Sequence, residues 1–389
     1  MLVPDLLVVS ELFPPAIGGS AVLLSEIYRR LHGHSVSVLT DETTSPGPDG
    51  DDGHAFSIQR RAIATRAWGL VNPAGALHHF EVGVRIRRMT NRRRSVVHCG
   101  RAIPEGIAAW MSRQMYGAPY VVWCHGEDIS TALTSRELTW VMTRVVRGAA
   151  AVIANSLSTR GLLLPLGIPE ERIHVVYPGV DPDRFHPGVD GSVLRRSLLR
   201  GGNALLLSVG RLQRRKGHDL VIDAMARLKS LLPGLRYVIV GDGEEKASLE
   251  RLVLSHGLAD RVTFVGAVSD NALPAYFAAC DVFAMPNRRE GADIEGFGIV
   301  FLEAAASGKP AIGGNSGGAP EAIDPEKTGL LVSGHDAGEL ADAVARLSRN
   351  AGERAAFGSA ARTRVLARFT WEHAAAKVAA IHAAVAAGT

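Results

Sequence analysis

Two glutamates bracket a glycine-containing apolar run in the segment EGADIEGFGIVFLE. The segment changes from loop to helix near Phe297, so Glu295 lies in the loop and Glu303 about two turns into the helix. Eight residues of helix rise about 12 Å, which is the reach of a nucleotide diphosphate sugar folded over a helix N-terminus. The backbone N–H groups of Phe297, Gly298 and Ile299 would point at the middle of such a ligand. The alternative is a pair of surface glutamates on an amphipathic helix.

Two basic residues that could bind a ligand follow an apolar run, in the loop VGRLQRRKG. Arg211 and Lys216 could together hold a diphosphate, because Arg offers planar contacts and Lys a point charge. Neutralising a departing diphosphate is a form of electrostatic catalysis. We expect Arg214 and Arg215 to face solvent, and the whole loop could do the same.

A glycine pair, Gly18 and Gly19, lies in PPAIGGS between a predicted strand and a predicted helix. Backbone N–H groups at a helix start attract phosphate, and glycine allows close approach of the backbone. The pattern is not the G-x-G-x-x-G of a dinucleotide site. A plain tight turn is the alternative.

The tetrapeptide HGED follows the apolar run YVVWC directly. His125 at the end of a strand could hydrogen-bond a substrate hydroxyl or act as an acid or base. Glu127 and Asp128 could do the same, or could cap the following helix.

Strands and helices that alternate along the chain must position these residues. Short apolar runs such as LLVVS, ALLLSVG and VTFVG are typical of strands that are buried on both faces, and helical patterns lie between them. The sequence therefore predicts an α/β protein of two doubly wound domains, over 1–190 and 191–368. The helix at 369–389 could complete the second domain or cross back to the first. Ligands in such sheets bind beyond the carboxyl ends of the strands, where the candidate residues lie.

The composition is that of a soluble globular protein, with 389 residues, 47% hydrophobic and 21% charged. The three cysteines, Cys99, Cys124 and Cys280, are widely spaced and indicate a reducing compartment. The sequence shows no signal peptide and no transmembrane run, so we expect a cytoplasmic protein.

Positive charge is concentrated in the first half, where residues 1–200 contain 22 Arg and no Lys. The densest part is RIRRMTNRRRS, and its residues 85–94 suit an anionic partner. We favour peripheral contact with the anionic inner face of a membrane. Aromatic interleaving and nucleic-acid motifs are missing, so no nucleic acid is expected. A solvated helix face is the alternative.

These features in this order resemble the retaining glycosyltransferases of family 4, which have the GT-B fold of two Rossmann-like domains facing a central cleft. The resemblance covers nearly the whole chain. The matching pieces are FPPAIGGS, HGED, PGVDPDRF, SVGRLQRRKG, VIVGDG, VTFVG, DVFAMP, EGFGIVFLEAAASGKP and GGAPE. FPPAIGG looks most like members that use GDP-mannose or UDP-sugars to elongate lipids and polysaccharides, including phosphatidylinositol mannosyltransferases.

The resemblance implies an N-terminal acceptor-binding domain and a C-terminal nucleotide-sugar-binding domain, with no metal and no cofactor. Arg211 and Lys216 would grip the donor phosphates, while Glu303 would bond the ribose and Glu295 the sugar. His125 would contact the sugar near the reacting centre. The remaining donor contacts would come from Gly18, Gly19, Phe297, Gly298 and Ile299.

The implied reaction is hexosyl transfer from the donor to a hydroxyl of a lipid, glycan or small molecule, with retention. The departing phosphate would take the proton, and its cationic partners would supply most of the catalysis. The alternatives are a nucleotide-sugar epimerase of the same architecture and a non-catalytic nucleotide-binding protein. A dehydrogenase would need the missing glycine fingerprint, and a phosphorylase a cofactor lysine and a longer chain.

Overall fold

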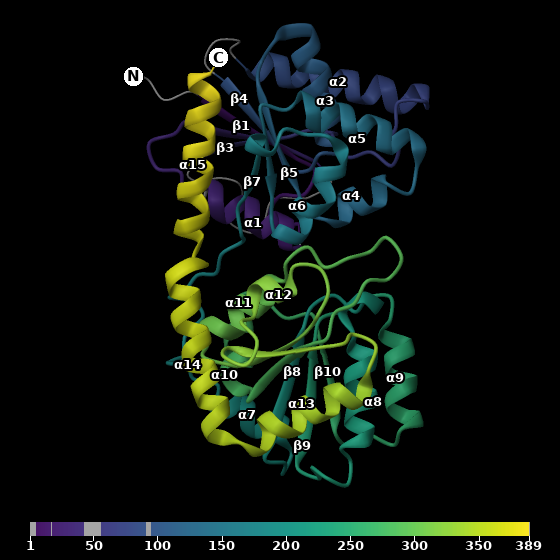
Figure 1. Ribbon diagram of the computed structural model, residues 1–389, viewed down its shortest axis with the longest axis vertical. Helices are drawn as coiled ribbons and strands as arrows, with labels where there is room; N and C mark the ends of the chain where they lie inside the picture. The colour runs from purple at the N-terminus through teal and green to yellow at the C-terminus, as the bar shows by residue number, and fades with distance from the viewer. Residues whose placement is uncertain (1–4, 17, 43–55, 91–94, 389) are drawn as a thin grey trace. The chain divides into compact units, whose positions relative to one another are not determined.

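The computed structural model describes residues 5–16, 18–42, 56–90 and 95–388. The chain divides into two compact units (Figure 1). Unit 1 contains Met1–Pro178 together with Trp371–Thr389, and unit 2 contains Gly179–Thr370. Strands and helices alternate along both units, which confirms the predicted doubly wound α/β class. The functional roles expected for the two domains remain predictions.

Unit 1 is built on a sheet whose seven described strands run in the order β3-β2-β1-β4-β5-β6-β7. All neighbouring pairs are parallel. The strands are β1 (Asp5–Ser10), β2 (Val36–Thr40), β3 (Ser57–Arg60), β4 (Ser95–Cys99), β5 (Tyr120–Cys124), β6 (Ala151–Ala154) and β7 (Ile173–Val175). The chain reverses its direction of sheet growth between β1 and β4, which makes the carboxyl ends of these two strands the topological switch point of unit 1.

The helices of unit 1 cover this sheet. Helix α2 packs on α3 and α3 on α5, whereas α1 packs on the C-terminal helix α15, which also contacts β4. The buried face of α15 combines the small Ala374 and Ala375 with larger side chains such as Trp371 and Ile381. The helices are α1 (Gly19–Tyr28), α2 (Pro73–Met89), α3 (Glu105–Tyr116), α4 (Glu127–Ala132), α5 (Arg136–Gly148), α6 (Leu157–Leu163) and α15 (Trp371–Ala387), with 3-10 turns η1 (Leu164–Leu166) and η2 (Glu170–Arg172).

Unit 2 has a six-stranded sheet in the order β10-β9-β8-β11-β12-β13, and its pairs are also parallel. Its strands are β8 (Ala204–Val209), β9 (Leu235–Val240), β10 (Val262–Gly266), β11 (Val282–Met285), β12 (Ala311–Gly314) and β13 (Gly329–Val332). The switch point of this sheet lies between β8 and β11. The two loops that contain Lys216 and Glu295 begin there.

The helices of unit 2 are α7 (Ser192–Leu199), α8 (His218–Arg227), α9 (Lys246–Ser255), α10 (Leu273–Ala279), α11 (Ile299–Ala306), α12 (Ala319–Ala322), α13 (Ala337–Arg349) and α14 (Ala351–Arg368), with the 3-10 turn η3 (Arg214–Lys216). Helix α11 begins at Ile299, slightly after the predicted start near Phe297. Gly298 precedes it in the left-handed conformation, with φ 87°, so the regular helix starts only after this residue.

The three cysteines are buried and unpaired, as their spacing predicted. Within the ranges that the structure describes, no helix is both long and apolar enough to cross a membrane.

Candidate functional site

The loop after β8 places Lys216 close to the chain that follows β11. Gly217 has φ 76°, and a Cβ added there would lie 2.4 Å from the carbonyl oxygen of Pro286. Glycine is therefore required both by the backbone conformation and by the space. The backbone N–H of Arg288 donates to the carbonyl oxygen of Arg215 at 2.8 Å, which ties the two loops together. Arg211 lies exposed at the start of the same loop.

Glu295 is the centre of a buried ion-pair network. Its Oε2 lies 2.5 Å from the Nζ of Lys216 and 2.5 Å from an Nη atom of Arg215. Arg215 also pairs with Asp293, through an Nε–Oδ1 distance of 2.8 Å. Burial opposes ionisation of Glu295, but Lys216 and Arg215 outweigh it and hold the pKa of this carboxyl below its ordinary value. Lys216 is thus held in place before any ligand arrives.

Arg215 was expected to face solvent with Arg214, and for Arg215 this expectation is wrong. Its side chain is only 12% exposed because it lies between two carboxylates of the β11–α11 connection. The arginines at 214 and 215 cannot be told apart in the sequence, because both lie in one short basic run. Their difference arises from the orientation of the 3-10 turn η3, which places neighbouring side chains on different sides.

Glu303 lies in α11 and has no ion-pair partner in the described part of the chain. Its Oε2 atom is shielded from solvent and has no hydrogen-bond partner among the described residues. Burial raises the pKa of this carboxyl to about 7, although the charge of Arg184 opposes the rise. A buried carboxylate normally has a partner, so this oxygen has an unused capacity to accept a hydrogen bond from a ligand.

The residues between the two glutamates support the start of α11. Phe297 is buried and its ring lies 6.0 Å from that of Phe369, so its side chain belongs to the core. A Cβ at Gly298 would lie 2.7 Å from the ring of Phe301, which leaves no room for a side chain. Ile299 is partly exposed at the first position of the helix. The contacts predicted for the backbone N–H groups of this segment remain predictions.

In unit 1 the predicted site residues follow β1 and β5. Gly18 ends the loop after β1 and Gly19 begins α1. His125 follows β5, and its Nε2 lies 2.8 Å from the carbonyl oxygen of Gly100. A carbonyl oxygen can only accept, so Nε2 donates its proton in this contact. The imidazole stacks on Trp123 at 6.2 Å between ring centroids, which limits its rotation.

Asp128 has a structural contact. Its Oδ1 accepts a hydrogen bond from the backbone N–H of His125 at 2.9 Å and so closes the turn before α4. The N-cap of α4 is Gly126, and no side chain hydrogen-bonds there, so this contact is not the capping role that the sequence left open for Asp128. Glu127 lies exposed in the first turn of α4.

Three charged residues that the sequence analysis missed meet near His125. One Nη atom of Arg101 lies 2.6 Å from Glu11 and 3.3 Å from Glu105, and Glu105 also accepts from the backbone N–H of Glu11 at 2.8 Å. Glu11 follows β1, whereas Arg101 and Glu105 follow β4. The sequence does hint at these three residues, because each follows an apolar run that is typical of a strand. None of them belongs to a recognisable motif, so the hint was missed.

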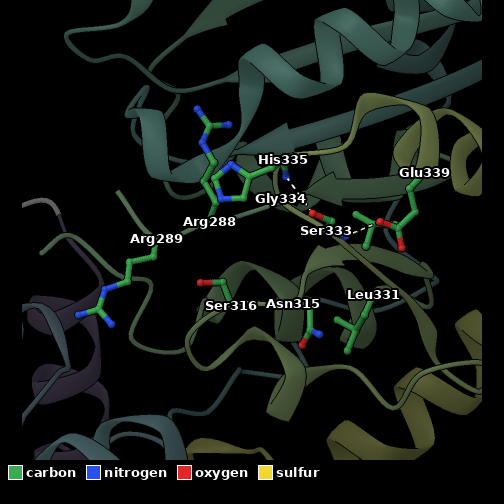
Figure 2. Close-up of a pocket in the computed structure, with 10 residues that line it drawn as sticks. Arg288, Arg289, Asn315, Ser316, Leu331, Ser333, Gly334, His335 and Glu339 are labelled. Atoms are coloured by element: carbon green, nitrogen blue, oxygen red, sulfur yellow. Dashed lines mark hydrogen bonds between the residues drawn. The ribbon is translucent and has the colours of Figure 1, made fainter. Parts of the chain in front are cut away.

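A pocket of about 400 Å³ opens in unit 2 beside the loops after β11, β12 and β13 (Figure 2). Within it, Arg288 forms a two-pronged pair with Asp219, at 2.7 and 2.9 Å, and a third contact with Glu290. Figure 2 shows Arg289 directed away from the other labelled side chains. The predicted donor residues do not line this pocket, so it is distinct from the Lys216–Glu295 site.

The basic run at 85–94 is described only as far as Thr90, because residues 91–94 lie outside the described ranges. Its first part is the end of α2. Arg87 lies over the ring of Tyr116, whereas Arg88 is exposed. Large apolar side chains are exposed at and before the start of the same helix, with Leu77 59% and Val71 78% exposed.

The sequence is similar to those of known glycosyltransferases. Two family models match the chain, "Glycosyl transferases group 1" over residues 193–364 and "Glycosyltransferase Family 4" over residues 17–184. A GDP-mannose-dependent alpha-(1-6)-phosphatidylinositol monomannoside mannosyltransferase of Mycobacterium tuberculosis is 36% identical over 378 residues, with 96% of each chain covered. D-inositol 3-phosphate glycosyltransferase 2 of Catenulispora acidiphila is 32% identical, with 94% of this chain and 90% of the relative covered.

Among solved structures, the fold is similar to that of Anabaena Alr3699/HepE in complex with UDP and glucose. The TM-score is 0.80, with 97% of this chain and 98% of that chain covered. Sequence identity is 22%, so this likeness concerns the fold alone. It agrees with the GT-B architecture expected from the sequence.

Proposed function

The chain belongs to glycosyltransferase family 4, and from this premise we propose that it transfers a mannosyl unit from GDP-mannose, with retention, to a hydroxyl of a lipid-linked acceptor. Both kinds of relative are named as enzymes that transfer a glycosyl unit. A relative that matches almost the whole chain is named as a GDP-mannose-dependent mannosyltransferase. The retained configuration of the transferred sugar and the lipid nature of the acceptor are proposed here together with the donor.

The observation that carries the proposal is the buried network of Lys216, Arg215 and Glu295 beside α11. A cation already held in place needs little reorganisation when the leaving diphosphate develops charge, which is the condition for strong electrostatic catalysis. Arg211, exposed at the start of the same loop, would add a second cation. Glu303 would accept a hydrogen bond from a ribose hydroxyl, which would satisfy its unpaired oxygen.

The chemistry assigned to these residues needs no acid–base pair. When the bond between the sugar carbon and the β-phosphate oxygen breaks, Lys216 and Arg211 stabilise the phosphate. The acceptor hydroxyl forms the new bond on the same face and gives its proton to the departing phosphate oxygen. Glu295 holds Lys216 and bonds the sugar hydroxyls. The role of His125 stays as the family resemblance implies it.

The membrane contact in this proposal rests on α2. Arg88 and the exposed apolar residues before it combine positive charge with apolar surface, as interfacial helices do. We propose that this helix holds unit 1 on an anionic bilayer, where a lipid acceptor would be found. The test is cosedimentation with vesicles containing phosphatidylglycerol, compared with vesicles of phosphatidylcholine alone.

The decisive experiment for the transfer itself uses a panel of nucleotide sugars. The full chain is incubated with GDP-mannose or UDP-sugars, with and without a phosphatidylinositol mannoside, and released nucleotide diphosphate is measured. Acceptor-dependent release of GDP and an α-linked product support the proposal. Release of UDP alone would show that the donor is a UDP-sugar and not GDP-mannose. Conversion of the donor sugar without transfer would indicate an epimerase. Binding without turnover would indicate a non-catalytic nucleotide-binding protein.

Thermal stabilisation gives a separate test of the donor base. Ligands that bind only the folded protein stabilise it by an amount that grows with affinity. GDP should raise the melting temperature more than equal concentrations of UDP. A larger effect of UDP would refute the choice of GDP-mannose.

A further inference from the structure

Glu11, Arg101 and Glu105 form a charged cluster that none of the proposed donor contacts uses. Glu11 follows β1, and the other two residues follow β4. These strands are neighbours in the sheet, and the cluster therefore lies at the switch point of unit 1, where open parallel sheets bind their ligands. His125 contacts Gly100, the residue before Arg101, so the cluster adjoins the predicted reacting side of unit 1.

The cluster contains more negative than positive charge. Arg101 is its one cation, and it contacts both Glu11 and Glu105. Burial opposes the charge of Arg101, but the surrounding carboxylates, Glu105 first and with Asp128 among them, hold its pKa above the ordinary value. Burial raises the pKa of Glu11, with Arg101 opposing this and Glu105 adding to it. A ligand at this place therefore meets two carboxylates for each guanidinium, and Asp128 adds to the negative side.

The cluster also has unused acceptors. The Oε2 of Glu105 and the Oδ2 of Asp128 are buried and have no hydrogen-bond partner among the described residues. Glu105 is only 4% exposed and is held by Arg101 and the backbone of Glu11. Because buried carboxylate oxygens normally accept hydrogen bonds, these two call for donors from water or a ligand. Glu11 is the more open member, with 23% of its side chain exposed.

We propose that the Glu11–Arg101–Glu105 cluster binds a neutral polyhydroxylated ring of the acceptor, a sugar or a cyclitol, through its hydroxyl groups. Carboxylates accept from hydroxyl protons, and the guanidinium donates to hydroxyl oxygens. A phosphomonoester has only acceptors at neutral pH and would bring like charge against two glutamates, which selects against it. The inference rests on the proposed function and adds to it the chemical class of the group at this subsite.

The two kinds of relative described above are named for different compounds. One is named for a phosphatidylinositol monomannoside and the other for D-inositol 3-phosphate. The charge of the cluster favours an acceptor whose ring hydroxyls, rather than a free phosphate, face Glu11. Any phosphate of a lipid acceptor would then lie away from this cluster.

The test measures acceptor binding directly. Methyl α-mannoside and mannose 6-phosphate are titrated into the full chain saturated with GDP, by ligand-observed NMR at pH 7.5 and low salt. We expect the mannoside to bind at least tenfold more tightly than the phosphate. Glu11→Gln should reduce this ratio to about threefold or less, mainly by weakening mannoside binding. The control Glu81→Gln removes an exposed charge from α2 in the same unit and should leave the ratio unchanged.

A second measurement on the unaltered protein does not depend on the folding of a variant. Between pH 5 and pH 7.5 a phosphomonoester passes through its second ionisation near pH 6, so the preference for the mannoside should widen. Equal or tighter binding of mannose 6-phosphate at pH 7.5, binding of neither compound, or a Glu11→Gln ratio equal to that of the unaltered chain would each overturn the inference. Mannoside selectivity without GDP-mannose turnover would instead refute the proposed transfer and leave the subsite in place.

Discussion

Replacing Glu303 with glutamine should make the protein more stable at pH 8 while weakening its hold on the nucleotide. The reason is the position of this carboxyl in α11. One oxygen is shielded from water and lacks a partner among the described residues, and burial raises the pKa to about 7 from an ordinary 4.5. Glutamine keeps the shape of the side chain but has no charge to bury.

The size of the effect follows from the two pKa values. A carboxyl whose pKa is raised by folding favours the folded state least at high pH, because the unfolded chain ionises freely while the folded chain resists it. Each pKa unit corresponds to about 1.4 kcal/mol. The rise to about 7 therefore costs about 3 kcal/mol of stability above pH 7 and about 1 kcal/mol at pH 5. The loss begins as the pH rises above 4.5 and is complete just above pH 7.

The assay compares melting temperatures of the unaltered chain and Glu303→Gln at pH 5 and pH 8. At about 2–4 °C per kcal/mol for a unit of this size, the variant should melt about 6–12 °C higher at pH 8 and only a few degrees higher at pH 5. Glu250→Gln, at an exposed glutamate of α9, is the control and should change neither value by more than a degree or two. Stabilisation by GDP should fall in Glu303→Gln only. A pH-independent difference, or a variant less stable at pH 8, would show that this carboxyl is not buried as described.

Three further predictions concern the same structure. Glu295→Ala removes the buried partner of Lys216 and should destabilise the protein by about 3 kcal/mol in urea denaturation. The same variant should lower kcat more than it weakens GDP binding. A larger loss of GDP binding than of kcat would refute the assignment of Glu295 to the sugar. Gly298→Ala, at φ 87° and with a phenylalanine ring in the way, should cost about 2 kcal/mol or more. Gly291→Ala, at φ 60° but with no atom close to the added Cβ, should lower the free energy of unfolding by about half as much. Equal losses in the two variants would show that the Phe301 ring does not hinder a side chain at position 298. Binding to anionic vesicles should weaken steeply as the salt concentration rises, and Arg88→Ala should weaken it at every salt concentration. Binding that does not depend on salt would indicate that the basic end of α2 is only a solvated helix face.

Much of the architecture could be predicted from local patterns. The continuous apolar runs at Leu6–Ser10 and Ala204–Gly210 correspond closely to strands, because a strand covered on both faces needs apolar side chains at consecutive positions. Lys216 and Glu295 were also expected to lie in loops that follow strands, and they lie in the loops after β8 and β11. The structure places them 2.5 Å apart, because the strands that lead to them are adjacent at a switch point.

The sequence alone thus determined the two doubly wound units, the loops that hold the candidate chemistry and the family to which those loops belong. Only the tertiary structure decided which charges are paired. It separated Arg215 from Arg214, brought Glu11 to Glu105 across 94 positions, and gave Glu303 its raised pKa. The physical reason is that local spacing encodes the period of an element, whereas ion pairing and desolvation depend on residues that the sheet order brings together from distant parts of the chain.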